Sequence, residues 1–197
     1  MNLKDKVILI TGAGKGRGRV LAKAFTEAGA SVAVNDVSPI NLDSLIEEST
    51  GAIKAYVEDV AKKVGAQNLI KQVEDDFGRI DVLINHAAVE PHVALLDMDE
   101  WDWHRVLDVN PTGAFLMIQS VGRVMRDQGS GVIINLVTGS VRDEAGDAAF
   151  VACMNALEAL SHRAAFELNR HGIRVYAVKE TGATIVERVF ALLAEEP

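Results

Sequence analysis

The sequence has little cysteine and no long apolar run near its start. Its single cysteine, Cys153, cannot form an internal disulfide or a cysteine-based zinc cluster, which fits a reducing compartment. The first apolar run covers only residues 7–10, which is too short for a signal-peptide core or a membrane span. We therefore expect a cytoplasmic protein that is not inserted in a membrane.

Positive charge is also scarce. The chain has 20 Lys and Arg against 28 Asp and Glu, a net charge of −8, and the basic residues form no cluster. A nucleic-acid partner is therefore not expected, because it would need a basic surface. The histidines are scattered, and Glu90-Pro91-His92 alone offers too few ligands for a metal, so no metal site is expected.

Short β-branched segments alternate with longer amphipathic ones along the whole chain. The expected strands cover 7–11, 31–36, 53–59, 80–85, 131–137 and 172–178, and a final helix is expected near 184–195. This alternation is typical of βαβ units, and strands that are apolar throughout are typical of a sheet covered on both faces. The 197 residues contain no linker or low-complexity tract. The sequence predicts a single α/β domain over 1–197, a doubly wound, Rossmann-like parallel sheet of about six strands with helices on both faces.

A glycine-rich turn follows the first expected strand. Glycines stand at 12, 14, 16 and 18, directly before an expected helix. Glycine lets the backbone approach a ligand closely, and a helix N-terminus offers unpaired N–H groups to a pyrophosphate. A flexible turn without a ligand is the alternative for an isolated glycine-rich string. Asp36 at the end of the second strand favours a ligand site, because its carboxylate can accept hydrogen bonds from an adenosine ribose.

The glycine spacing fits TGxxxGxG, with Thr11 and Gly12 at its start, and neither GxGxxG nor the Walker pattern. This motif resembles that of the short-chain dehydrogenase/reductase family, and the resemblance extends to about residue 178. Four further segments resemble family elements in the same order along the chain. Asp59-Val60 resembles the adenine-contacting pair, and Asn85-His86-Ala87-Ala88 resembles the family's NNAG element except at His86 and Ala88. Asn110 matches the helix asparagine that in the family holds a water of the proton relay, and residues 155–178 resemble a helix-strand segment of the family.

The resemblance implies a Rossmann-type NAD(P)-binding domain. The implied cofactor-binding residues are Gly12, Lys15, Gly16, Arg17, Gly18, Asp36, Val37, Asp59, Val60, Asn85 and Ala87. Asp36 would repel a 2′-phosphate, so NAD is favoured over NADP, although Lys15 argues mildly for NADP. The alternatives are that Asp36 and Asp59 are plain strand-end or capping carboxylates, and that the two asparagines satisfy neighbouring backbone groups.

The catalytic positions of the family are altered in this chain. In the family a tyrosine exchanges the proton on the substrate oxygen, a lysine lowers the pKa of that phenol and binds the nicotinamide ribose, and a serine holds the substrate oxygen. Matching the segment 156–160 to the family helix puts Phe150 at the tyrosine position, Met154 at the lysine position and Thr138 at the serine position. Phe150 has no hydroxyl and Met154 has no charge. The lost acid or base is worth about 10²–10⁴ in rate.

The resemblance therefore implies a catalytically disabled oxidoreductase homologue that acts by binding or assembly. The competing hypothesis is an active NAD(P)-dependent oxidoreductase on a small alcohol or carbonyl compound, which uses an atypical proton donor. The candidate donors are Tyr176, His86, His92, Lys179 and Cys153. A third hypothesis is a structural partner that binds no nucleotide.

Two further expectations follow from the resemblance. Family members continue after the sixth strand through a substrate loop to a seventh strand, whereas here a turn near Gly182 leads into one helix, so the domain is expected to be shortened at its C-terminus. The expected long helices 98–126 and 144–170 are rich in Ala, Leu, Val and Met. Equivalent helices in the family pack against partner subunits, which implies a homodimer, a homotetramer or a mixed assembly with an active relative. The alternative is that these apolar faces belong to the protein's own core.

Overall fold

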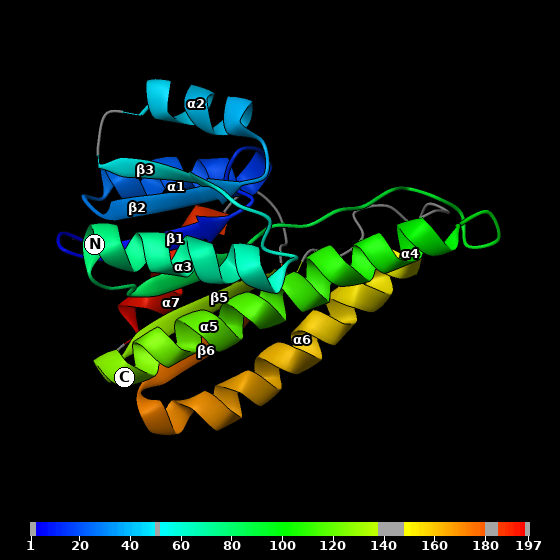
Figure 1. The fold of residues 1–197 in the computed structure, drawn as a ribbon. Coiled ribbons are helices and arrows are strands. Elements are labelled where there is room, and N and C mark those ends of the chain that lie inside the picture. The colour runs from blue at the N-terminus through cyan, green and yellow to red at the C-terminus, as the bar shows by residue number, and fades with distance from the viewer. Residues whose placement is uncertain (1–2, 50–51, 138–147, 180–184, 196–197) are drawn as a thin grey trace.

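Each of the six expected strand segments forms a strand. The computed structural model describes residues 3–49, 52–137, 148–179 and 185–195. Its strands are β1 (Val7–Thr11), β2 (Ser31–Asp36), β3 (Ile53–Val57), β4 (Val82–Asn85), β5 (Gly131–Val137) and β6 (Ile173–Lys179). They pair in parallel as one sheet in the order β3-β2-β1-β4-β5-β6 (Figure 1). The predicted parallel sheet is confirmed. β3 ends two residues before its predicted end, which leaves Glu58 and Asp59 in the following loop.

Helices cover both faces of this sheet. They are α1 (Gly16–Glu27), α2 (Pro39–Glu47), α3 (Lys63–Phe77), α4 (Glu100–Leu107), α5 (Gly113–Gln128), α6 (Ala148–Leu168) and α7 (Ile185–Ala194). One apolar core joins α1, α2 and α7 to the even-numbered residues of the central strands, such as Ile8 and Ile84. The other joins α3, α5 and α6 to odd-numbered residues such as Leu9 and Leu83. Because successive strand residues point to opposite faces, uniformly apolar strands serve both cores.

The helix expected over 98–126 is divided into α4 and α5 by a π-helical turn, Asp108–Thr112. Pro111 lies inside this turn and has no N–H to donate to the carbonyl four residues earlier. A π turn shifts the bonding by one residue, and the Gly113 N–H accordingly bonds to Asp108. The turn places Asn110, which is almost fully buried, at the junction of the two helices.

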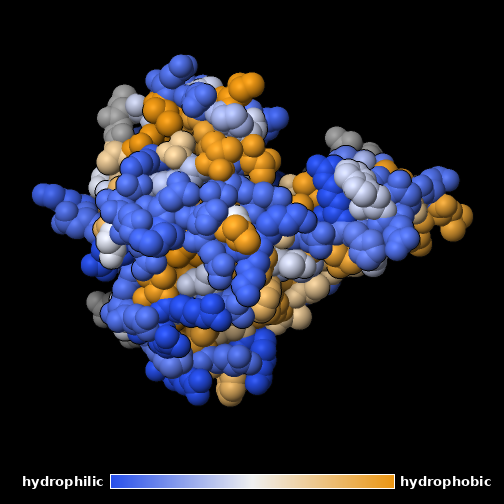
Figure 2. Space-filling view, in the orientation of Figure 1, coloured by the Kyte–Doolittle hydropathy of each residue, from blue (hydrophilic) through white to orange (hydrophobic). Residues whose placement is uncertain are grey.

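α4 and the beginning of α6 pack together beyond the end of the sheet. Val106 of α4 contacts Ala149 and Cys153 of α6 in a small apolar cluster. Figure 1 shows the two helices projecting from the sheet, and Figure 2 shows hydrophobic surface at the outer end of the projection. Leu95 and Leu96, in the segment before α4, are exposed. The first residues of the helix expected over 144–170 lie outside the described residues.

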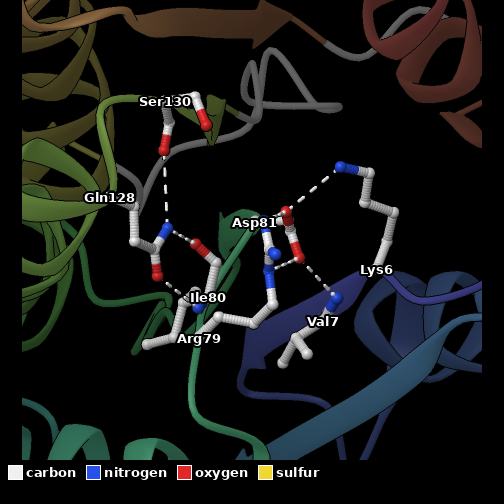
Figure 3. Close-up of polar contacts among 7 residues, drawn as sticks. All are labelled: Lys6, Val7, Arg79, Ile80, Asp81, Gln128 and Ser130. Atoms are coloured by element: carbon white, nitrogen blue, oxygen red, sulfur yellow. Dashed lines mark hydrogen bonds and ion pairs between the residues drawn. The ribbon is translucent and has the colours of Figure 1, made fainter.

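A polar network holds together the amino ends of β1 and β4 (Figure 3). The buried carboxylate of Asp81 accepts a hydrogen bond from the Val7 N–H at 2.9 Å and pairs with Lys6 at 3.2 Å and Arg79 at 2.6 Å. The Gln128 side chain bonds to the N–H and the carbonyl of Ile80, at 3.0 and 2.9 Å. This network lies at the amino ends of the strands, opposite their carboxyl ends.

The sheet order reverses at β1, which has β2 on one side and β4 on the other. In open α/β sheets such a reversal leaves a crevice at the carboxyl ends of the strands. Within the described ranges, no helix combines the length and the apolar composition that crossing a membrane requires.

Candidate functional site

A cavity of about 770 Å³ lies at the carboxyl ends of β1, β2 and β4, beside the reversal of strand order. Of the predicted cofactor-binding residues, those that line it are Gly12, Lys15, Arg17, Asp36, Val37, Asp59, Val60 and Ala87. Gly16, Gly18 and Asn85 are not among its lining residues. The fold thus brings these residues, which lie up to 75 positions apart in the sequence, together in one cavity wall.

The glycine turn needs glycine for two physical reasons. Gly12 has a φ of +64°, and a Cβ on it would lie 2.7 Å from Cα of Ala87. A Cβ on Gly18 would lie 2.8 Å from the carbonyl oxygen of Gly12. α1 begins at Gly16, its N-cap residue Lys15 makes no side-chain capping bond, and its first turn holds no acidic residue. Because the first N–H groups of a helix have no acceptor within the helix, this helix start suits an anion.

Asp36 supports the glycine turn as well as lining the cavity. One carboxylate oxygen accepts the Gly14 N–H and the other accepts the Ser38 N–H, both at 3.0 Å. The strand-end role that the sequence left as an alternative is therefore present. Each carboxylate oxygen has a second lone pair, so ligand contact by Asp36 stays a prediction.

Arg19 joins the glycine turn to α2. Its guanidinium donates to the carbonyls of Gly14 and Asn41, at 3.3 and 3.1 Å, and to the Ser44 hydroxyl at 3.1 Å. It also pairs with Glu48 at 2.6 Å. The role of Arg19 could not be predicted from the sequence, because its partners in and directly after α2 lie 22 to 29 residues away and no local pattern connects them.

Two side chains position the segment that follows β3. The Asn35 amide donates to the carbonyls of Tyr56 and Glu58, at 3.1 and 2.9 Å. Asp59 accepts the Ala61 N–H at 3.0 Å, a local turn bond after the strand, whereas the N-cap residue of α3 is Lys62. Asn35 lines the cavity and was also missed, since a polar residue inside a buried strand carries no signal of what it bonds.

The end of β4 is bonded to the end of β1. The Thr11 hydroxyl oxygen accepts the N–H groups of His86 and Ala87, at 3.1 and 3.2 Å, and Nδ1 of His86 lies 3.0 Å from the Gly12 carbonyl oxygen. Burial lowers the pKa of His86 below its ordinary value, and Arg17 lowers it further, against opposing effects of the Gly12 carbonyl and Asp36. His86 lines the cavity in a mainly neutral form at pH 7.

Asn85 points into the interior. Its amide donates to Asn135 at 2.8 Å, Asn135 donates to Ser161 at 2.8 Å, and Ser161 donates to the Leu157 carbonyl at 2.6 Å. The chain of bonds leaves Oδ1 of Asn85 buried and without a partner among the described residues. Asn85 therefore joins β4 to β5 and α6.

Asn110 holds the segment after β4. Its side chain accepts the Val89 N–H at 2.8 Å and donates to the Val89 carbonyl at 3.0 Å. This is the backbone-satisfying role that the sequence left open for Asn110. Val89 lines the cavity, whereas Asn110 does not, so Asn110 holds part of the cavity wall in place from the protein interior.

Phe150 and Met154 belong to the same apolar cluster but differ in whether they line the cavity. Phe150 is buried, with 5% of its surface exposed, and lines the cavity. Met154, one turn further along α6, lies in an apolar cluster with Ala114, Val137 and Leu157 and is not among the lining residues. Thr138 lies outside the described residues.

Most of the candidate proton donors are engaged elsewhere. The Tyr176 hydroxyl donates to Glu195 at 3.0 Å, Lys179 pairs with Glu158 at 2.8 Å, and His92 lies 3.8 Å from Glu90. Cys153 is buried, which raises the pKa of its thiol.

Among these candidates, His86 is the one that lines the cavity. Arg105, which no motif indicated, also lines it, with its guanidinium 5.2 Å from the centre of the Trp101 ring. In the part of the chain that the structure describes, no three His, Cys, Asp or Glu side chains are grouped so that they could hold a metal.

Comparisons with known proteins agree with this architecture. A family model described as short chain dehydrogenase matches residues 6–187. The 3-oxoacyl-acyl-carrier-protein reductase FabG of Thermotoga maritima is 36% identical over 183 residues, which are 90% of this chain and 74% of that protein.

Two solved structures share the fold closely. A crystal structure of NAD+-bound xylitol dehydrogenase has a TM-score of 0.85 and 31% identity, and the match covers 98% of this chain and 78% of that one. A metagenomic short-chain oxidoreductase in complex with NADP has a TM-score of 0.89 and 27% identity, and the match covers 99% of this chain and 92% of that one.

Proposed function

The chain belongs to the short-chain dehydrogenase family, and from this premise we propose that it binds NAD in the cavity at the strand ends but has lost the family's tyrosine-dependent chemistry. It would then act by binding or assembly. The observation that carries the proposal is the coexistence of a complete glycine turn with a phenylalanine in the cavity wall.

Nucleotide binding is supported by the geometry of the turn. Gly12 approaches Ala87 closely, α1 begins without a capping side chain, and Lys15 and Arg17 line the cavity on the same side. Backbone N–H groups and two cations together suit a pyrophosphate. Val37 and Val60 would offer apolar contacts to an adenine ring. The solved neighbours named above hold NAD+ in one case and NADP in the other.

The proposed preference for NAD rests on Asp36. Its carboxylate lines the cavity at the end of β2, where it would accept hydrogen bonds from ribose hydroxyls and repel a 2′-phosphate. Both carboxylate oxygens are held by backbone N–H groups, so the charge cannot easily turn away from the cavity.

The proposed loss of chemistry rests on functional groups. A bound nicotinamide would supply or accept a hydride, but the paired proton transfer needs an ionisable group at the substrate oxygen. Phe150 presents only hydrocarbon to the cavity, and Met154 lies among apolar side chains. Neither residue can exchange that proton.

The competing function is an active oxidoreductase on a small alcohol or carbonyl compound. FabG of Thermotoga maritima is named as a reductase, and His86 is a titratable side chain inside the cavity. Such an enzyme would need His86 to replace the tyrosine.

Calorimetry and a turnover assay test these alternatives. We expect heat of binding with NAD+ or NADH below millimolar concentration, weaker binding of NADP+, and no turnover across alcohols and ketones. Turnover near the enzyme median of about 10 per second would refute the loss of chemistry. Absence of any heat at millimolar nucleotide would refute the cofactor proposal and favour a purely structural partner.

Restoring the lost groups gives a sharper test. In the double variant Phe150→Tyr, Met154→Lys, gain of NAD-dependent activity over Phe150→Tyr alone would support a loss confined to the two side chains. Circular dichroism must show a folded protein first, because the lysine enters an apolar cluster. Activity in the unaltered protein that disappears in His86→Asn would instead support the competing function.

We also propose a homodimer or homotetramer formed through α5 and α6, or a mixed assembly with an active relative. Large apolar side chains on these helices are exposed, namely Phe115, Val151 and Phe166. Light scattering should give a multiple of the 21.2 kDa chain mass, and Phe166→Glu with Phe115→Glu should reduce it. The control Leu96→Glu changes an exposed residue that belongs to neither helix. If the protein is monomeric at all concentrations, the homo-oligomer is ruled out and only the mixed assembly remains. Co-purification with an active relative would test that assembly.

A further inference from the structure

His86 is held in one orientation by its backbone and its ring. Its N–H donates to the Thr11 hydroxyl at 3.1 Å, and its Nδ1 lies 3.0 Å from the Gly12 carbonyl oxygen. A carbonyl oxygen only accepts hydrogen bonds, so Nδ1 must carry the proton of this bond. In the neutral ring, Nε2 is then an unprotonated acceptor.

The ring packs against the turn that is proposed to hold the pyrophosphate. A Cβ on Gly18 would lie 2.7 Å from Nδ1 of His86, so the imidazole, the Gly12 carbonyl and the first turn of α1 are in close contact. His86, Gly12 and Arg17 line the same cavity. A pyrophosphate at this helix start would therefore bring two negative charges close to the imidazole.

Burial, more than the surrounding charges, favours the neutral form of His86. Burial has the largest effect and lowers its pKa, the bond to Gly12 raises it, Arg17 lowers it, and Asp36 raises it. The other charged residues that line the cavity are Lys15 before α1, Glu58 and Asp59 after β3, Glu90 on the segment that follows His86, and Arg105 on α4. A negative charge added beside the imidazole favours its protonated form, because opposite charges stabilise the charged form.

We propose that His86 takes up a proton at Nε2 when a pyrophosphate-bearing nucleotide binds, so that nucleotide affinity rises as the pH falls. The proton comes from the solvent, and no bond of the nucleotide is made or broken. The inference rests on the proposed nucleotide binding, to which it adds an interacting residue and a pH dependence. In the free protein the pKa of His86 lies below its ordinary value, so protonating the ring without a bound anion takes a lower pH.

Titration calorimetry in buffers of different ionisation enthalpy measures this proton directly. At about pH 6, NAD+ binding should take up part of one proton, and the affinity should rise between about pH 8 and about pH 5.5 by at most about tenfold per pH unit. His86→Asn is the matched variant, because its amide can still donate to the Gly12 carbonyl but does not titrate. We expect no proton uptake in this variant. Adenosine, which lacks the pyrophosphate, should bind the unaltered protein without proton uptake.

The outcomes separate this inference from the function on which it rests. NAD+ binding without proton uptake, or with equal uptake in His86→Asn, overturns the role of His86 and leaves nucleotide binding intact. Absence of NAD+ binding overturns both. If the variant does not fold, NMR titration of the five histidine rings in the unaltered protein replaces it. One ring should then show a higher pKa with NAD+ than without, and unchanged rings would overturn the inference.

Discussion

At the scale of single residues, Phe150 and Met154 stand four apart on α6 and belong to one cluster of apolar side chains from α5, β5 and α6. They differ in that Phe150 also lines the cavity, whereas Met154 does not. A hydroxyl added at position 150 can therefore face the cavity. An ammonium added at position 154 enters an apolar cluster, so a hydroxyl at position 150 and an ammonium at position 154 are not equally easy to introduce.

Met154→Lys should lower the free energy of unfolding by about 2–4 kcal/mol, because it buries a charge in an apolar cluster. Met154→Leu, the matched apolar substitution, should cost less than about 1.5 kcal/mol. Urea unfolding of both variants measures the difference. Equal stability of the two would mean that a polar partner for the lysine exists at this position.

Asp36→Asn should reduce the discrimination between NAD+ and NADP+ by about tenfold, or about 1.4 kcal/mol. The asparagine oxygen can still accept one of the two backbone N–H bonds, so the turn keeps part of its support while the charge is removed. Calorimetric affinities for both nucleotides give the ratio. An unchanged ratio would show that the carboxylate does not set the preference.

At the scale of elements, long polar side chains join segments that the backbone alone does not connect. Arg19 links the glycine turn to α2 at the carboxyl end of the sheet. Asp81 links β1 to the start of β4 at the amino end. Arg19 joins elements that shape the cavity, so substituting Arg19 should affect ligand binding as well as stability. Asp81 joins strands of the sheet, so substituting Asp81 should affect stability.

Arg19→Met should weaken NAD+ binding and lower stability by about 1–2 kcal/mol, because the carbonyls of Gly14 and Asn41 and the Ser44 hydroxyl lose their shared donor. The control Lys23→Met removes only an exposed pair with Glu48, so its effect on stability should be small. Calorimetry and urea unfolding measure the two effects. If Arg19→Met bound NAD+ as tightly as Lys23→Met, Arg19 would have no role in positioning the turn.

Asp81→Asn should lower the free energy of unfolding at pH 7 by about 1–3 kcal/mol. Burial alone would raise the pKa of Asp81, but Arg79, the Val7 N–H and Lys6 together hold it below its ordinary value. A carboxylate with a lowered pKa in the folded protein stabilises it above its unfolded pKa of about 3.9. That contribution is lost as the pH falls through the lower folded value.

The difference between Asp81→Asn and the unaltered protein should therefore shrink in acid. Urea unfolding at about pH 7 and about pH 3 measures this change. The exposed Asp127, paired with Arg126, provides the control Asp127→Asn, which should change stability by less than about 0.5 kcal/mol. A deficit for Asp81→Asn that stays constant with pH would rule out its charge as the cause.

At the scale of the whole molecule, the reversal of strand order places the proposed ligand among several elements at once. The cavity wall includes residues from the ends of β1, β2 and β4, from α4 and from α6. A ligand held there contacts only the folded chain, because the unfolded chain does not bring these segments together. Binding should therefore stabilise the entire fold.

NAD+ at one hundred times its dissociation constant should add about 2.7 kcal/mol to the free energy of unfolding. For a chain of this size that corresponds to a rise in melting temperature of about 5–11 °C. Thermal unfolding with increasing NAD+ measures it, with nicotinamide alone as the control. A melting temperature that does not depend on NAD+ concentration would contradict the proposed site.

The sequence by itself determined the elements and the chemical groups. Segments such as 7–11 and 131–137 were predictable as strands because uniform apolarity and β-branching act locally. The glycine turn was predictable because its backbone conformation depends on a few adjacent residues. That Phe150 carries no hydroxyl and Met154 no charge follows from residue identity alone.

The tertiary structure decided which groups meet. It turned Asn85 inward to Asn135, bonded Asn110 to Val89, and brought His86 against Gly12 across 74 residues. No local periodicity encodes such contacts, because they depend on the pairing of β1 with β4 and on how helices cross the sheet. Hydrogen-bonding partners far apart in the chain are set by that packing, and so is the shape of the cavity they enclose.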